Sequence, residues 1–148
     1  MTDQKWMLQA IDQAQLALSS SEVPVGCVIT DGKELISKAH NQTLTLGNPC
    51  AHAEILAITE AAKKLANHRL INCEVFVTLE PCLMCIGAMV QARIKRLVFA
   101  CKDSRVGLLS NNTLQDIIPQ LNHYFLVESG LMSQSAQTLL KDFFRQKR

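Results

Sequence analysis

Apolar residues recur at three- and four-residue spacing in several segments of the chain, which is the pattern of a helix that buries one face. In the first of these segments, Met7, Ala10 and Ile11 are followed by further apolar residues at the same spacing. The predicted helices are Trp6–Ser20, His52–Leu65, Cys82–Ala92, Ser133–Arg148 and, with a weaker pattern, Leu114–Leu121.

Short runs of β-branched and aromatic residues separate these helices and predict strands. Asp31-Gly32-Lys33 is a turn signal that joins the first two runs into a hairpin. Helices then alternate with strands, so we expect an α/β fold in a single domain, residues 1–148: a three-layer α/β/α sandwich with a mixed five-stranded sheet. The predicted strands are Gly26–Thr30, Glu34–Ala39, Glu74–Leu79, Arg96–Cys101 and Tyr124–Glu128, with loops at Asn41–Pro49 and Asp103–Asn112.

Composition narrows the class of protein. Hydrophobic residues make up 48% of the 148 residues and the formal net charge is +2, which excludes a disordered chain. No stretch approaches the roughly 18 apolar residues of a membrane span, so no membrane association is expected. The N-terminus, with Asp3, lacks the basic start and apolar middle of a signal peptide. We therefore expect a cytoplasmic protein whose six cysteines are reduced and free to bind a metal.

Two short segments carry residues with metal chemistry, and each lies at the start of a predicted helix. They are Pro49-Cys50-Ala51-His52-Ala53-Glu54 and Pro81-Cys82-Leu83-Met84-Cys85. Cys82 and Cys85 are one turn apart at a helix N-terminus, where the helix dipole favours thiolates. Two thiolates and one imidazole make three zinc ligands and leave the fourth position for water or substrate. We interpret Cys50, which adjoins the site, as a packing residue.

Glu54 decides between a catalytic and a structural metal site. At the first turn of a helix, side chains two residues apart need not diverge far, so His52 can be a ligand while Glu54 reaches a bound water. Zinc makes that water acidic enough to supply hydroxide near neutral pH. This nucleophile suits attack on an amidine-like ring carbon, with Glu54 protonating the ring nitrogen and the leaving ammonia, which is the known chemistry of zinc deaminases.

Motifs that carry a family resemblance run along almost the whole chain. They are Glu22-Val-Pro-Val-Gly26, Asn41, Ala51-His-Ala-Glu-Ile55, Val77-Thr-Leu-Glu-Pro-Cys82, Met84-Cys85, Gly87-Ala-Met89, Asn122-His123 and Phe143-Phe-Arg145. With these motifs the chain resembles the cytidine/deoxycytidylate deaminase superfamily, and within it the bacterial tRNA-specific adenosine deaminases. The Met-Cys-x-Gly-Ala-Met stretch and the spacing of Asn41 favour this branch over the cytidine deaminases.

The resemblance implies deamination of adenosine to inosine at the wobble position of a tRNA anticodon, in a homodimer of cytidine deaminase-like fold with one zinc ion per subunit. It assigns His52, Cys82 and Cys85 as zinc ligands and Glu54 as the proton shuttle for a zinc-bound hydroxide. The residues implied in contacts with the tRNA anticodon stem-loop are Asn41, which would bind the flipped nucleotide, Val25, Ala53 and Pro81, which would line its pocket, and Asp103 and Phe144, which match positions near the RNA.

Several residues keep more than one interpretation. His123 is either an RNA contact or the partner of a tertiary hydrogen bond, and Glu80 is interpreted as a support for the helix start and the neighbouring loop. Gly107-Leu-Leu-Ser-Asn111 stands where the family commonly has a Gly-rich stretch, which affects the expected RNA contacts. Basic residues gather at 63–64, 93–96, 102–105 and 141–148, a distribution that allows a phosphate-binding surface.

Two other functions remain open from the sequence. A deaminase of a free nucleoside, nucleotide or base, of the guanine or cytosine type, would use the same zinc core. A noncatalytic nucleic-acid-binding module would instead hold a structural zinc with a fourth protein ligand, for which Cys50 is the candidate.

Overall fold

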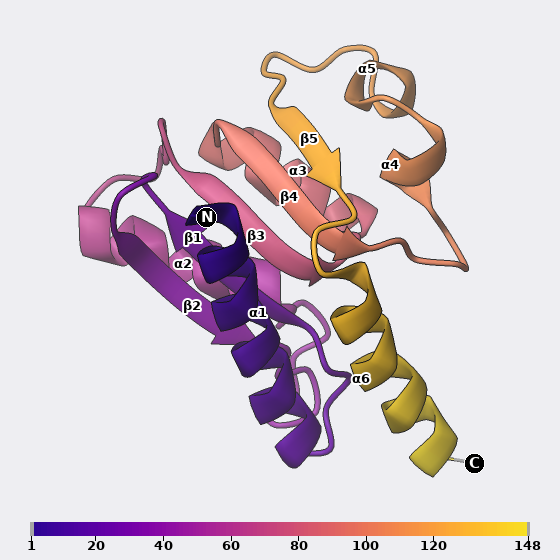
Figure 1. Ribbon diagram of the computed structural model, residues 1–148. Helices are drawn as coiled ribbons and strands as arrows, with labels where there is room; N and C mark the ends of the chain where they lie inside the picture. Colours follow the sequence, from indigo (N-terminus) through magenta and orange to yellow (C-terminus); the bar gives the residue numbers. More distant parts are fainter. Residues whose placement is uncertain (1, 148) are drawn as a thin grey trace.

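The computed structural model of the protein describes residues 2–147, which form one mixed sheet of five strands (Figure 1). The strands lie in the order β2-β1-β3-β4-β5. β1 is antiparallel to both of its neighbours, whereas β3, β4 and β5 are parallel. The strand bounds are β1 Gly26–Thr30, β2 Leu35–His40, β3 Glu74–Leu79, β4 Arg96–Cys101 and β5 Leu126–Ser129.

Helices cover both faces of this sheet, which confirms the predicted three-layer α/β/α sandwich. Two long helices, α1 (Thr2–Ser19) and α6 (Ser133–Gln146), pack side by side on one face (Figure 1). The helices α2 (Ala53–Leu65) and α3 (Leu83–Ala92) pack on the other. The described helices lack the combination of length and apolarity that crossing a bilayer requires.

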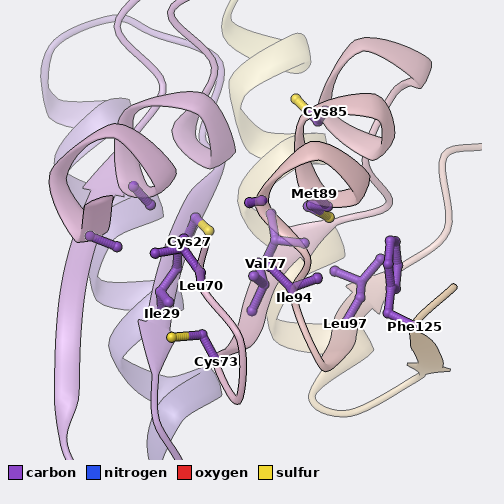
Figure 2. Close-up of a cluster of buried hydrophobic side chains, with 14 of the residues drawn as sticks. Cys27, Ile29, Leu70, Cys73, Val77, Cys85, Met89, Ile94, Leu97 and Phe125 are labelled. Atoms are coloured by element: carbon purple, nitrogen blue, oxygen red, sulfur yellow. The ribbon is translucent and has the colours of Figure 1, made fainter. Parts of the chain in front are cut away.

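The core on the α2/α3 face explains how the sheet is held against the helices. Buried side chains from the strands, such as Ile29 and Val77, meet Met89 of α3 in one apolar cluster (Figure 2). Cys85 belongs to the same cluster and is fully buried, so the start of α3 is anchored in the core. On the opposite face, Gly26 permits the close approach of α1, because a Cβ there would collide with the backbone of Ala10.

The element bounds differ from the sequence-based prediction mainly after β4. β1, β3 and β4 have the predicted bounds, while α1 begins at Thr2. The predicted loop Asp103–Asn112 contains a short helix, α4 (Leu108–Asn111), so that prediction is wrong in part. α5 (Leu114–Ile117) ends before the predicted Leu121, because the residue before Pro119 is disfavoured in the helical conformation. Arg148, the predicted end of the last helix, lies outside the described residues.

Candidate metal centre and its surroundings

The three predicted metal ligands lie at the N-termini of two neighbouring helices. His52 is the N-cap of α2 and Cys82 is the N-cap of α3, both with extended backbone, and Cys85 lies in the first turn of α3. The two helix starts meet because β2 and β3 finish at the same end of the sheet. The last residue of β2, His40, pairs with Gly26, the first residue of β1. β3 runs antiparallel to β1, so its last residues also lie beside the start of β1.

The donor atoms of these residues have the separations of a tetrahedral zinc site. His52 Nδ1 lies 3.6 Å from the Sγ of Cys82 and 3.6 Å from that of Cys85, and the two sulfurs are 3.8 Å apart. A tetrahedral zinc ion, with Zn–S of about 2.3 Å and Zn–N of about 2.0–2.1 Å, requires separations of about 3.6 and 3.8 Å. Within residues 2–147, the cluster that could hold a metal consists of these three residues; Cys50 is not part of it. The residues present therefore fit a zinc ion with a fourth position free of protein donors.

The two cysteines are chemically prepared for a cation. The hydrogen bond shared with Cys85 lowers the pKa of Cys82 to about 5, with further help from the backbone N–H groups at the start of α3 and from His52, against the opposing effect of burial. The same hydrogen bond raises the pKa of Cys85, and burial and the charge of Glu54 add to this effect. Because zinc binds thiolates, metal binding would release the protons that these thiols carry.

Glu54 lies one residue inside α2 and is only 4% exposed. Burial raises the pKa of its carboxyl, against the backbone hydrogen bond and the attraction of His52. The charge of Glu54 helps to raise the pKa of both Cys85 and Cys27, so Glu54 lies beside the cluster. Ala53, its neighbour in the first turn, is fully buried. A buried carboxyl of raised pKa next to a metal site is suited to proton transfer.

Asn41 is a buried polar residue at the end of β2 with an unused acceptor. Its backbone N–H donates to Val25 O at 3.0 Å and its Nδ2 donates to Val23 O at 3.4 Å, but Oδ1 has no partner. The next residue, Gln42, donates to Ala51 O at 3.0 Å, which holds the end of β2 beside His52. Leaving a buried acceptor unpaired costs about 1–3 kcal/mol, so Oδ1 is available to a donor on a ligand.

A cavity of 710 Å³ opens at the carboxyl ends of β3 and β4, where Leu79 and Cys101 line it. Asp103 and Phe144, two of the predicted RNA-binding residues, also line it, and Phe144 is 43% exposed. His52, Glu54 and the two cysteine ligands are not among its lining residues, so the cavity does not include the metal cluster. Four basic side chains surround it: Lys102, Arg105, Lys141 and Arg145.

The structure does not bring His123 to this region. Its Nε2 is hydrogen-bonded to Ile94 O at 2.8 Å, and Ile94 precedes β4, at the opposite end of that strand from Cys101. The remaining predicted site residues are buried. Val25 accepts a hydrogen bond from the backbone N–H of Asn41. Ala53 and Pro81 directly precede Glu54 and Cys82 in the sequence.

Two of the basic residues at 93–96, Arg93 and Arg96, serve contacts within the fold. The guanidinium of Arg96 forms ion pairs with Asp3, Glu74 and Glu128, which joins α1, β3 and β5. Arg93 donates to the carbonyl and side chain of Asn122. The basic residues in the stretches 102–105 and 141–145 are exposed and lie around the cavity.

Two buried carboxylates hold loops beside the site. Glu22, fully buried, accepts hydrogen bonds from Leu44 and Thr45 in the loop after Asn41. Glu80, 4% exposed, accepts hydrogen bonds from the segment after β4. The sequence analysis predicts a supporting role for Glu80 but assigns no role to Glu22. The partners of Glu22 lie more than twenty residues away in sequence, so only the structure identifies it as a buried acceptor.

Comparisons with known proteins agree with this geometry. The model of the cytidine and deoxycytidylate deaminase zinc-binding region matches residues 1–101. The tRNA-specific adenosine deaminase of Haemophilus influenzae is 37% identical over 147 residues, which are 99% of this chain and 85% of that protein. The tRNA-specific adenosine deaminase of Aquifex aeolicus is 41% identical over 141 residues, 94% of this chain and 91% of that protein.

Solved structures show the same relationship. A structure from a study of A-to-I editing by tRNA:A34 deaminases superposes with a TM-score of 0.86 at 34% identity and covers 92% of this chain and 99% of its own. A guanine deaminase of Bacillus subtilis superposes with a TM-score of 0.63 at 32% identity, covering 66% of this chain and 63% of its own.

Proposed function

Because this chain belongs to the cytidine and deoxycytidylate deaminase family, we propose that it deaminates adenosine to inosine at the wobble position of a tRNA anticodon. Its relatives are named tRNA-specific adenosine deaminases, and the similar solved structure comes from a study of A-to-I editing at the wobble position. It acts as a single cytoplasmic domain in a homodimer with one zinc ion per subunit. The metal ligands are His52, Cys82 and Cys85. The observation that carries the proposal is their tetrahedral arrangement beside a buried Glu54.

The chemistry divides between the metal and the protein. When bound, zinc lowers the pKa of a coordinated water and so supplies a nucleophile at neutral pH. Glu54 accepts a proton from the attacking water and passes it to the ring nitrogen of adenine. The same carboxyl then carries a proton to the departing amino group, so that adenosine and water become inosine and ammonia. Burial, which raises the pKa of Glu54, suits it to both transfers.

Residues around the metal cluster orient the substrate. The free Oδ1 of Asn41 accepts a hydrogen bond from the flipped nucleotide. Val25, Ala53 and Pro81 form the apolar wall of the base pocket. Closing such a pocket around the base keeps bulk water away from the reacting carbon.

RNA binding is assigned to the cavity at the carboxyl ends of β3 and β4. Its four basic side chains suit backbone phosphates, and the exposed ring of Phe144 can stack on a base. Asp103 lies at its rim. We leave His123 out of the contact set, because it is hydrogen-bonded at the other end of β4.

The homodimer proposal is supported by apolar side chains exposed near the metal cluster. Leu83 and Met84, at the start of α3, are 52% and 36% exposed, and Leu44 and Leu46 are exposed in the loop that follows β2. Met89, by contrast, is fully buried in the core of its own subunit. Light scattering on the zinc-loaded protein tests the dimer directly.

The test of function is inosine formation by the zinc-loaded protein. The substrates are an anticodon stem-loop with adenosine at the wobble position, the same stem-loop with adenosine moved to another loop position, and free adenosine, cytidine and guanine. We expect inosine at the wobble position alone. Deamination of a free compound would support the proposed metal chemistry but would show that the substrate is not the RNA. The similarity to a guanine deaminase is the reason for including these free compounds.

A noncatalytic metal site predicts a different result. It requires a fourth protein ligand, and cobalt substitution would then reveal three thiolates. We expect two thiolates, one imidazole and an exchangeable solvent ligand, because Cys50 is outside the cluster.

A further inference from the structure

Glu80 directly follows Leu79, which lines the cavity, and stands two residues before the metal ligand Cys82. Both oxygens of its carboxylate accept hydrogen bonds. Oε1 accepts from the backbone N–H of Asp103 at 3.0 Å and from the hydroxyl of Ser110. Oε2 accepts from the N–H groups of Leu109 at 2.7 Å and Ser110 at 3.1 Å. The backbone N–H of Glu80 donates to Cys101 O at 2.9 Å, which fixes the carboxylate at the point where β4 ends.

These contacts need a carboxylate rather than an amide. All four partners are donors, and two of them are N–H groups at the start of α4, which have no acceptor within a helix of four residues. A glutamine has the same shape but offers one acceptor oxygen. Its NH₂ group could donate to the hydroxyl of Ser110, but in either orientation it would face at least one backbone N–H donor. Replacing Glu80 by Gln therefore leaves at least one half-buried N–H group without its acceptor while preserving the side-chain volume.

The segment that Glu80 holds is one wall of the cavity. Lys102, Asp103 and Arg105 line the cavity from this segment, and the opposite wall is formed by α6. Asp103 is itself ordered, because its Oδ1 accepts from the backbone N–H of Arg105 at 2.9 Å. The position of two cations relative to α6 thus depends on a buried side chain that does not line the cavity.

We propose that Glu80 is a positioning residue that holds residues 102–110 as a preformed wall for the RNA, so that it sets affinity for the anticodon stem-loop and leaves the chemical step to Glu54. This inference rests on the proposed function. When residues 102–110 already have their binding conformation, RNA binding does not have to include the free-energy cost of ordering them. If only a fraction of the molecules have this segment ordered, the apparent affinity falls in proportion to that fraction.

The test compares Glu80→Gln with the unaltered protein, both zinc-loaded. We expect KM and the Kd for the stem-loop to rise about tenfold, corresponding to an ordered fraction of about one tenth. The kcat and the zinc content stay unchanged. Hydrogen exchange at the amides of Asp103, Leu109 and Ser110 accelerates, which a change confined to RNA contacts would not cause.

Thr30→Val is the matched control. Thr30 is also fully buried and ties a turn through hydrogen bonds to Gly32 and Glu34, but at the hairpin between β1 and β2. It should accelerate exchange in that hairpin without changing KM. If Glu80→Gln does not fold, Ser110→Ala removes one of the four donors and should raise KM about threefold.

Each outcome decides the inference. A fall in kcat at unchanged KM, or faster amide exchange with KM within twofold of the unaltered value, overturns it. If the unaltered protein binds the stem-loop without forming inosine, the proposed function fails, and the ratio of the two Kd values still decides the role of Glu80. If the unaltered protein does not bind the stem-loop, both proposals are rejected.

Discussion

Replacing Glu54 by Gln tests the proposed proton shuttle with the least disturbance of the structure. The carboxyl lies in the first turn of α2 and is 4% exposed, and an amide fills the same space. His52, Cys82 and Cys85 keep their donor atoms, so zinc binding is expected to persist. The substitution therefore removes the ability to carry a proton and little else.

The structure sets the size of the expected loss. A positioned acid or base contributes about 10²–10⁴-fold to a rate. Among the described residues, the other buried carboxyls, Glu22 and Glu80, have their oxygens hydrogen-bonded to loops and cannot replace Glu54. Because one carboxyl serves both proton transfers, we expect the upper end of that range, about 10⁴-fold, or about 5 kcal/mol at 1.36 kcal/mol per factor of ten.

Single-turnover inosine formation on the anticodon stem-loop, with enzyme in excess, measures this loss without interference from product release. Zinc content is determined on the same preparation. Glu60→Gln is the matched control, because Glu60 lies on the exposed side of the same helix and should react at the unaltered rate. A loss smaller than about tenfold at full zinc occupancy would refute the assignment of Glu54.

Three further changes probe other parts of the molecule. Cys85→Ala should reduce zinc, measured by elemental analysis, to near zero and abolish inosine formation, because two protein donors remain. Glu22→Gln should destabilise the fold at neutral pH and less so in acid. Burial raises the pKa of Glu22, but hydrogen bonds from Thr45 and its neighbours lower it below the ordinary 4.5. The ionised carboxylate therefore stabilises the fold above pH 4.5, and this stabilisation is lost as the pH falls through the lowered pKa. Thermal unfolding of both proteins between pH 7 and about pH 3 would show the difference shrinking, and a constant difference would contradict it. Gly26→Ala should lower the free energy of unfolding in urea by about 1–3 kcal/mol, because its Cβ collides with Ala10.

The fold was predictable wherever the local pattern and the tertiary structure agree. The bounds of β1, β3 and β4 follow from apolar β-branched runs, and in the structure these strands are buried along nearly their whole length. α4 was not predictable, because its first N–H groups are satisfied by Glu80, a residue almost thirty positions earlier. No local pattern reports a contact of that sequence separation.

The candidate site divides in the same way. The spacing of His52, Cys82 and Cys85 implies a metal cluster, and the structure places their donor atoms together. The pairing of Arg96 with three carboxylates could not be read from a basic segment, since sequence shows charge but not partners. Likewise, the free acceptor of Asn41 becomes visible only when the surrounding donors are located.

The metal cluster and the cavity draw on different stretches of chain. The cluster and Glu54 come from residues 52–85, whereas the cavity is lined almost wholly by residues 101–145. Mutations in the second stretch can therefore change the lining of the cavity without altering the metal ligands. For protein engineering, this separation makes residues 102–105 and the exposed face of α6 the positions to randomise when a new nucleic-acid target is sought.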